Sequence, residues 1–143
     1  MSKEYRDPLK LDSQLCFPLY AAAREVTRKY RPFLDGIGLT YTQYITMMVL
    51  WEHTQISSRD LGSRLYLDSG TLTPLLKSME AKGLIERSRS KEDERVLMVS
   101  LTEEGKALKK KAAGIPEKVV GCIALSPEEA VQLYGLLYKI LGK

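Results

Sequence analysis

The sequence predicts a mainly α-helical protein with a small β-hairpin, arranged as a winged helix-turn-helix flanked by helices from both chain ends. Three observations indicate this. Helix-capping residues stand before most apolar segments, so predicted helices outnumber predicted strands. Two short helical segments meet across a tight turn, as in a helix-turn-helix. Directly after them, an entirely polar stretch at residues 87–94 separates two strand-like segments, which is typical of a wing.

The length and composition indicate one compact unit. The chain has 143 residues, about the size of one domain, so we expect a single domain over residues 1–143. No apolar run approaches the roughly 18 residues of a membrane span, and we expect no membrane partner. Met1–Lys10 carries no apolar signal segment, and the chain's two cysteines do not make a disulfide framework. The expected location is therefore cytoplasmic.

The charge balance permits an anionic partner without requiring one. Lys and Arg total 22 against 18 Asp and Glu, a net charge of +4, and no segment forms a basic tail. Any evidence for nucleic-acid binding must therefore come from the geometry of motifs.

The first two helices are predicted from their caps. The first helix is expected from a cap at Asp12 or Ser13 to about Leu34, before a segment with two glycines. Thr40 and Gln43 then have the form of a capping box, which opens an apolar helix that we expect to lie mostly in the core.

The helix-turn-helix comes next. Ser57 and its polar neighbours cap a helix that ends near Leu65, and Asp68 and its neighbours cap a second helix that runs to Lys82. Gly83 is a natural residue for the end of that helix.

The wing and two more helices follow. Leu84 and Ile85 begin one strand, and Arg95–Leu101 is β-branched and apolar enough for its partner. Thr102 caps a lysine-rich helix that is interrupted around residues 114–116, and Ser126 caps the last helix.

We expect the flanking segments, about residues 9–36 and 103–143, to be dimerisation helices around a winged helix-turn-helix at about 40–102. Exposed apolar surface costs roughly 25 cal/mol per Å², so a symmetric homodimer is expected to cover these helices. The alternative is that they close over the core of their own chain. The last helix carries an apolar stripe made by Leu133, Leu136, Leu137, Ile140 and Leu141.

Three segments around the wing have a long and specific spacing: Gly83–Arg87, Asp93–Arg95 and Leu101–Gly105. Together with Leu76 and Met79, they resemble the signature of the MarR family of dimeric winged-helix repressors. Within that family, the chain is similar over about residues 9–141 to the OhrR-type organic-hydroperoxide sensors. That similarity is carried by Gln14–Phe17 with Leu19–Ala21, by Tyr30 and Tyr41, and by Trp51–His53 and Tyr66–Pro74.

The resemblance implies a repressor that binds double-stranded operator DNA as a homodimer and is released when an organic hydroperoxide oxidises Cys16. A MarR-type repressor that a small aromatic ligand releases without covalent chemistry is the alternative.

The second helix of the motif is the candidate for major-groove contacts. A helix N-terminus presents small polar side chains and free backbone N–H groups to phosphates and base edges. The alternative is that Ser69 and Thr71 only cap the helix. The candidate residues are Ser69, Gly70, Thr71 and Thr73, with Lys77 and Lys82 further along.

The wing carries basic side chains that could contact the minor groove and the phosphates of the DNA. A guanidinium at the hairpin shoulder, Arg95, can enter the narrow minor groove, whereas Arg89 and Lys91 at the tip suit phosphates. The family resemblance implies that Asp93 orients Arg95 through a bidentate salt bridge. The alternative is a solvated charged loop.

Cys16 is the candidate sensor because a thiolate is the nucleophile that attacks a peroxide, and the dipole of a helix N-terminus favours the thiolate. If the helix begins at Asp12, Pro18 kinks it beside the thiol; if it begins near Phe17, the proline lies in the first turn without penalty. The alternative role for Cys16 is ordinary packing.

A hydroperoxide pocket needs hydrogen-bond donors and apolar walls, which Tyr20, Tyr30, Tyr41 and Phe17 supply. Tyr30 follows Cys16 by 14 residues, roughly 21 Å along a straight helix, so the two cannot touch within one helix. As the resemblance implies, the pocket is expected between two subunits.

Cys122 resembles the second cysteine of the two-cysteine members of this subfamily. That resemblance implies a disulfide from Cys16 of one subunit to Cys122 of the other after sulfenic acid formation. The alternatives are a small core residue at position 122 and a mixed disulfide of Cys16 with a small thiol.

Other classes find little support. A thiol peroxidase needs a Thr or Arg close upstream of Cys16, and none stands there, so we expect no enzyme. His53 is the single histidine, and with two scattered cysteines it makes no tetrahedral metal site. No cofactor is expected, because the sequence has no glycine-rich phosphate loop.

Overall fold

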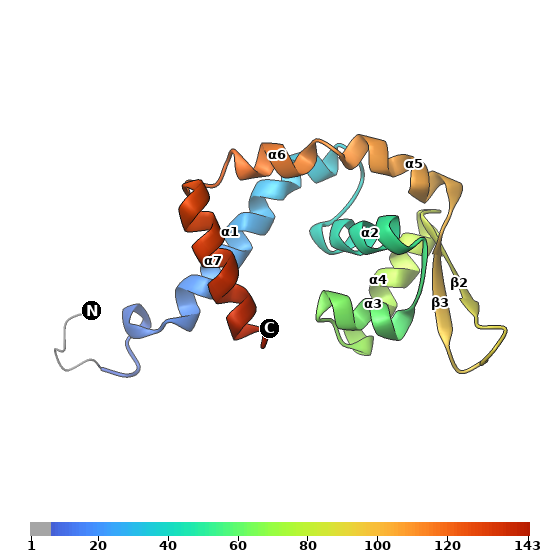
Figure 1. The fold of residues 1–143 in the computed structure, drawn as a ribbon, viewed down its shortest axis with the longest axis horizontal. Coiled ribbons are helices and arrows are strands. Elements are labelled where there is room, and N and C mark those ends of the chain that lie inside the picture. Colours follow the sequence, from blue (N-terminus) through green and yellow to red (C-terminus); the bar gives the residue numbers. More distant parts are fainter. Residues whose placement is uncertain (1–6) are drawn as a thin grey trace.

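The computed structural model describes residues 7–143 (Figure 1). Residues 1–6 lie outside the described residues. They are part of Met1–Lys10, the segment that we predicted not to be a signal segment. The helices are α1 (Cys16–Asp35), α2 (Tyr41–His53), α3 (Ser58–Leu65), α4 (Ser69–Ala81), α5 (Glu103–Ala112), α6 (Ile115–Val120) and α7 (Pro127–Ile140); the strands are β1 (Gln55–Ser57), β2 (Ile85–Arg89) and β3 (Leu97–Leu101).

Figure 1 shows two ends of an elongated molecule. The helix-turn-helix (α3 and α4), α2 and the sheet form one end, while most of α1, with α6 and α7, lies at the other. Helix α5 leads from the sheet towards α6. The predicted winged helix-turn-helix with helices from both chain ends is confirmed.

The predicted start of the first helix is wrong. Asp12 and Ser13 lie in a short 3-10 turn, η1 (Leu11–Ser13), and α1 begins only at Cys16. Pro18 explains the late start: in a helix that began at Asp12 it would lack the N–H that bonds to the Gln14 carbonyl, whereas in the first turn of a helix that begins at Cys16 no such bond is lost. The second of the two predicted arrangements is therefore the observed one, and Cys16 is the first residue of α1.

The other predicted helix starts are confirmed. Thr40 and Gln43 form both bonds of the capping box, with Gln43 N donating to Thr40 Oγ1 and Thr40 N donating to Gln43 Oε1. The remaining capping side chains each accept a hydrogen bond from a backbone N–H three residues on; they are Ser57, Asp68, Thr102 and Ser126.

The predicted hairpin is the larger part of a three-stranded antiparallel sheet in the order β1-β3-β2. Strand β1 was missed because it has only three residues. It pairs with β3, with Ile56 opposite Val99. Strand β3 begins at Leu97 rather than at Arg95, so Arg95 belongs to the turn at the wing tip.

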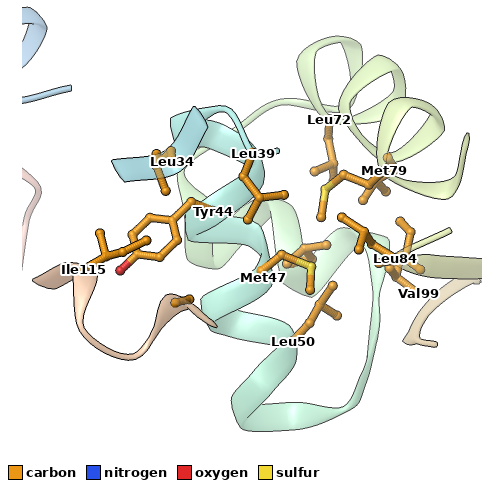
Figure 2. Packing of buried hydrophobic residues seen from close by; sticks show 14 of the residues in the cluster. Leu34, Leu39, Tyr44, Met47, Leu50, Leu72, Met79, Leu84, Val99 and Ile115 are labelled. Carbon is orange, nitrogen blue, oxygen red and sulfur yellow. The ribbon is translucent and has the colours of Figure 1, made fainter. Parts of the chain in front are cut away.

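The core fills the space between α2, α3, α4 and the sheet (Figure 2). Tyr44 of α2 lies beside Leu34 of α1 and Ile115 of α6, so the core also holds the ends of these two flanking helices. Its fully buried members include Leu34, Met47, Leu50, Leu61, Leu76, Met79, Ile85, Val99 and Val119.

Helix α7 does not close over this core. It contains no buried residue, and Val131, Leu136 and Ile140 are 72%, 60% and 64% exposed. At the start of α1, Leu15 is 82% exposed. The alternative that the flanking stripes close over their own core is therefore wrong for α7 and for the start of α1, while the end of α1 and α6 do pack on that core. Among residues 7–143, no helix has the length and apolar character needed to cross a lipid bilayer.

Gly105→Ala is expected to destabilise the fold by about 2 kcal/mol through overpacking. A Cβ at Gly105 would overlap the carbonyl oxygen of Leu84, and the Gly105 carbonyl accepts a hydrogen bond from Trp51 Nε1 at 2.9 Å. Urea denaturation measures the loss as a lower midpoint at an unchanged slope. The matched control is Gly114→Ala, where a Cβ meets nothing within 4 Å; equal midpoints for the two variants would contradict the prediction.

Candidate DNA-binding face and thiol site

The first turns of α4 present a small polar surface. Ser69, Thr73 and Lys77 are exposed and spaced by four residues, so they lie on one face of the helix with Gly70 beside them. The Thr73 hydroxyl donates to the Ser69 carbonyl at 2.8 Å, which fixes its position. Thr71 is also exposed but points to another side of the helix, and its backbone N–H donates to the capping Asp68 carboxylate.

Lys82 does not extend this surface. Its Nζ donates to the Gly38 carbonyl at 2.7 Å and to Gln43 Oε1 at 2.8 Å. The suggestion that Lys82 continues the DNA-facing row was wrong, because these two contacts tie its ammonium to the corner between α1 and α2.

The wing carries an exposed, oriented guanidinium. Arg95 Nε and Nη2 donate to the two carboxylate oxygens of Asp93 at 3.1 and 3.2 Å, while the Arg95 side chain remains 90% exposed. The hydrogen bonds from Arg95 hold the pKa of Asp93 below its usual range. Arg89 ends β2 and Lys91 lies in the tip, both exposed. The wing therefore presents three cations, one of them held in a fixed orientation.

A second arginine pair joins the wing to α4, and the sequence analysis missed it. Arg87 on β2 donates from Nη2 and Nε to Glu80 Oε2 at 2.8 and 3.1 Å, and its backbone N–H donates to Glu80 Oε1. These bonds lower the pKa of Glu80. The sequence contains a signal for this pair. Glu80 lies in the last turn of α4, and the chain turns back at Gly83 into β2, so an acid near the end of the helix comes close to a basic residue near the start of the strand.

Cys16 is exposed at the first position of α1 and forms no disulfide within the described chain. Tyr20 follows one turn later, and its hydroxyl oxygen accepts a hydrogen bond from Arg24 Nη1 at 3.1 Å. Since that oxygen accepts from Arg24, the Tyr20 proton is free to be donated elsewhere. Because it is exposed, Cys16 is not packed into the core of its own chain.

Tyr30 and Tyr41 lie together, away from Cys16 of the same chain. Their ring centroids are 5.0 Å apart, and Tyr44 completes the cluster at 5.6 Å from Tyr30. Burial raises the pKa of all three phenols, so each keeps its proton and can donate a hydrogen bond. Because α1 is one continuous helix, Cys16 and Tyr30 stand roughly 21 Å apart along it. Tyr44 was missed because it has the character of a core residue.

Cys122 lies just beyond α6 and is exposed, with its Sγ donating to the Lys118 carbonyl at 3.3 Å. The alternative that it is a core residue is therefore wrong. Within the described part of the chain, no group of three or more His, Cys, Asp or Glu side chains could hold a metal ion.

Comparisons with known proteins agree with this geometry. A family model described as transcriptional regulator SarA/Rot matches residues 28–112. The organic hydroperoxide resistance transcriptional regulator of Bacillus subtilis is 51% identical over 135 residues, covering 94% of this chain and 92% of the relative. The HTH-type transcriptional regulator SarZ of Staphylococcus aureus is 42% identical, covering 93% and 90%.

Among solved structures, reduced AbfR bound to DNA matches with a TM-score of 0.76 at 32% identity, covering 92% of this chain and 91% of that one. The winged fold, the exposed α4 and the level of identity lead to one conclusion: the chain belongs to the MarR-like SarA/Rot family of winged-helix transcriptional regulators.

Proposed function

We propose that this chain is a cytoplasmic DNA-binding repressor that senses organic hydroperoxides by oxidation of Cys16 and is then released from its operator. The observation that carries the proposal is an exposed thiol at the start of α1, on a helix whose apolar face has no partner in its own chain. The regulator of Bacillus subtilis that is 51% identical is named for organic hydroperoxide resistance. We propose no enzymatic turnover, because each Cys16 reacts with one hydroperoxide molecule when the repressor leaves the DNA.

A homodimer makes the DNA-binding geometry complete. The exposed faces of α1, α6 and α7 cover one another when two copies pair about a twofold axis. Two α4 helices then stand about 34 Å apart, one turn of DNA, and contact two half-sites of a pseudopalindromic operator. The DNA-contacting residues are Ser69, Gly70, Thr71, Thr73 and Lys77 on α4, with Arg89, Lys91, Asp93 and Arg95 on the wing.

The same pairing assembles the sensor. Tyr30 on α1 lies too far along that helix to contact Cys16 of its own chain, and Tyr41 on α2 packs against Tyr30. Crossed α1 helices bring Cys16 of one protomer to these phenols of the other. Their protonated hydroxyls, with Tyr20 from the same helix, donate hydrogen bonds that stabilise a thiolate.

The chemistry then follows from the thiolate. Its sulfur attacks the terminal oxygen of the hydroperoxide; the S–O bond forms as the O–O bond breaks, and the alkoxide takes a proton and leaves as an alcohol. The sulfur loses two electrons and becomes a sulfenic acid. Cys122 of the partner subunit, or a small thiol, can then displace water from that sulfur to form a disulfide.

Cys122→Ser is expected to abolish a covalent dimer that hydroperoxide produces in the unmodified protein, because the second sulfur is gone. Non-reducing electrophoresis after treatment with cumene hydroperoxide measures this dimer. A band that persists in the variant, or an unmodified protein that stays monomeric on the gel, would show that Cys122 does not capture the sulfenic acid.

Arg95→Ala is expected to weaken operator binding by about 1–3 kcal/mol, because the wing loses its oriented guanidinium in the minor groove. Fluorescence anisotropy at one fixed salt concentration measures the Kd. Lys110→Ala, at an exposed lysine in the last turn of α5, is the control and should change little. Equal affinities for the two variants would remove Arg95 from the interface.

The function itself is tested with DNA from upstream of the chain's own gene. The reduced protein should bind it, cumene hydroperoxide should release it, and the corresponding alcohol, cumyl alcohol, should not. Release by the alcohol would favour a repressor that responds to a noncovalent aromatic ligand, and retention after hydroperoxide treatment would overturn the sensor.

A further inference from the structure

A buried amide joins the recognition helix to the corner between α1 and α2. Gln43 is only 4% exposed. Its Nε2 donates to Ser78 Oγ at 3.0 Å, and its Oε1 accepts from Lys82 Nζ at 2.8 Å and from the Thr40 backbone N–H at 3.1 Å. Two of these partners belong to the last turn of α4 and its cap, so a single side chain on α2 holds that end of the recognition helix.

Lys82 strengthens the same connection. Its Nζ also donates to the Gly38 carbonyl at 2.7 Å, in the loop between α1 and α2. Gly38 has a φ of +71°, a conformation that glycine adopts without strain. The C-terminal end of α4 is therefore fixed to the corner at two points, Gly38 and Gln43.

The other side of this corner is the tyrosine cluster. Tyr41 and Tyr44 belong to the same first turn of α2 as Gln43, and both pack against Tyr30 of α1. Two residues along a helix correspond to about 200° of rotation, so Gln43 and Tyr41 point to nearly opposite sides of α2. One turn of helix thus contacts the sensor tyrosines on one side and the recognition helix on the other.

We propose that Gln43 and Lys82 are positioning residues that transmit the state of the tyrosine cluster to α4. The proposal rests on the proposed function, since it needs oxidation of Cys16 to move the tyrosines. When Tyr41 shifts, the first turn of α2 shifts with it, and the hydrogen bonds of Gln43 and Lys82 carry the end of α4 along. The spacing of the two recognition helices changes, and the operator is released.

The test measures coupling rather than affinity alone, because coupling between sites is a ratio of binding constants. Gln43→Leu removes all side-chain hydrogen bonds at similar volume, and Lys82→Met removes the ammonium but keeps an unbranched stem. For each variant, anisotropy with the upstream duplex gives the ratio of Kd after and before cumene hydroperoxide. Mass spectrometry measures oxidation of Cys16 in the same samples.

We expect the ratio to fall by about tenfold in both variants while Cys16 is oxidised as in the unmodified protein. The double variant should be no worse than the stronger single variant, because both residues serve one connection. Gln43→Glu should retain the ratio, since a carboxylate still accepts from Lys82 and from Thr40. Lys110→Met is the matched control for the lysine change and should leave the ratio unaltered.

An unchanged ratio with both Kd values raised together would indicate a merely structural role and overturn the proposal. Lys82 is exposed, so Lys82→Met is expected to fold. If Gln43→Leu does not fold, the coupling ratio of Lys82→Met alone decides whether the proposal holds. An unmodified protein that keeps its DNA after Cys16 is oxidised would overturn the proposed function as well, which distinguishes the two failures.

Discussion

Replacing Cys16 with serine is expected to give a repressor that binds its operator with nearly the affinity of the reduced protein and does not respond to organic hydroperoxide. A serine hydroxyl has almost the size of the thiol but is not oxidised by a peroxide. The loss of response should be complete, because the other cysteine in residues 7–143 is Cys122 beyond α6, and in the proposed mechanism it reacts only with an already oxidised Cys16. Anisotropy across a range of hydroperoxide concentrations measures the response.

Cys122→Ser is the matched control, since it removes the same atom elsewhere and should still release DNA at a sufficient hydroperoxide concentration. A Cys16→Ser variant that is still released by hydroperoxide, with unchanged dose dependence, would show that the sensor lies at another residue. A variant that no longer binds DNA in the absence of peroxide would instead show that the sulfur is needed for the bound geometry.

Leu136→Glu is expected to dissociate the dimer and weaken operator binding by about 100-fold, roughly 2.7 kcal/mol. Leu136 is 60% exposed in the single chain, and a twofold interface places the new carboxylate there twice. A buried charge without a partner costs several kcal/mol, so the protomers separate. Each protomer then contacts only one half-site, and the affinity gained from joint binding is lost.

Sedimentation velocity measures the oligomeric state, and anisotropy measures the affinity of the same samples. Lys110→Glu on α5 introduces the same side chain outside the exposed apolar faces and should leave the dimer intact. A dimeric Leu136→Glu protein with normal affinity would place the interface on another surface, and a monomer that binds as tightly as the original would remove the need for a dimer.

Much of the fold could be predicted because local signals and tertiary packing agree. Capping side chains at Thr40, Ser57, Asp68 and Ser126 mark helix starts through hydrogen bonds within a single turn, and sequence spacing alone specifies such bonds. The start of α1 was predicted wrongly because two plausible caps precede Pro18, and only the proline determines where the helix begins. Strand β1 was missed because three residues have no periodicity to detect.

The candidate sites divide in the same way. The exposed stripe on α4 and the Asp93–Arg95 pair depend on short separations, so spacing and resemblance predicted their geometry, though not their contact with DNA. Lys82 has the appearance of one more basic residue on a helix, yet it contacts Gly38 and Gln43 about 40 residues earlier, and no local pattern predicts such a partner. Tyr44 was missed because it is a buried residue of an apolar helix, and its contact with Tyr30 of α1 is a tertiary one that no local pattern shows.

The most direct test compares sulfur oxidation with DNA release in one titration. Reduced protein on its upstream duplex is treated with increasing cumene hydroperoxide, and at each step mass spectrometry gives the fraction of Cys16 oxidised while anisotropy gives the fraction of DNA released. The two fractions are expected to rise together and to fall together when a thiol reductant is added. Release that precedes oxidation of Cys16, or full oxidation with the DNA still bound, would contradict the proposed sensor.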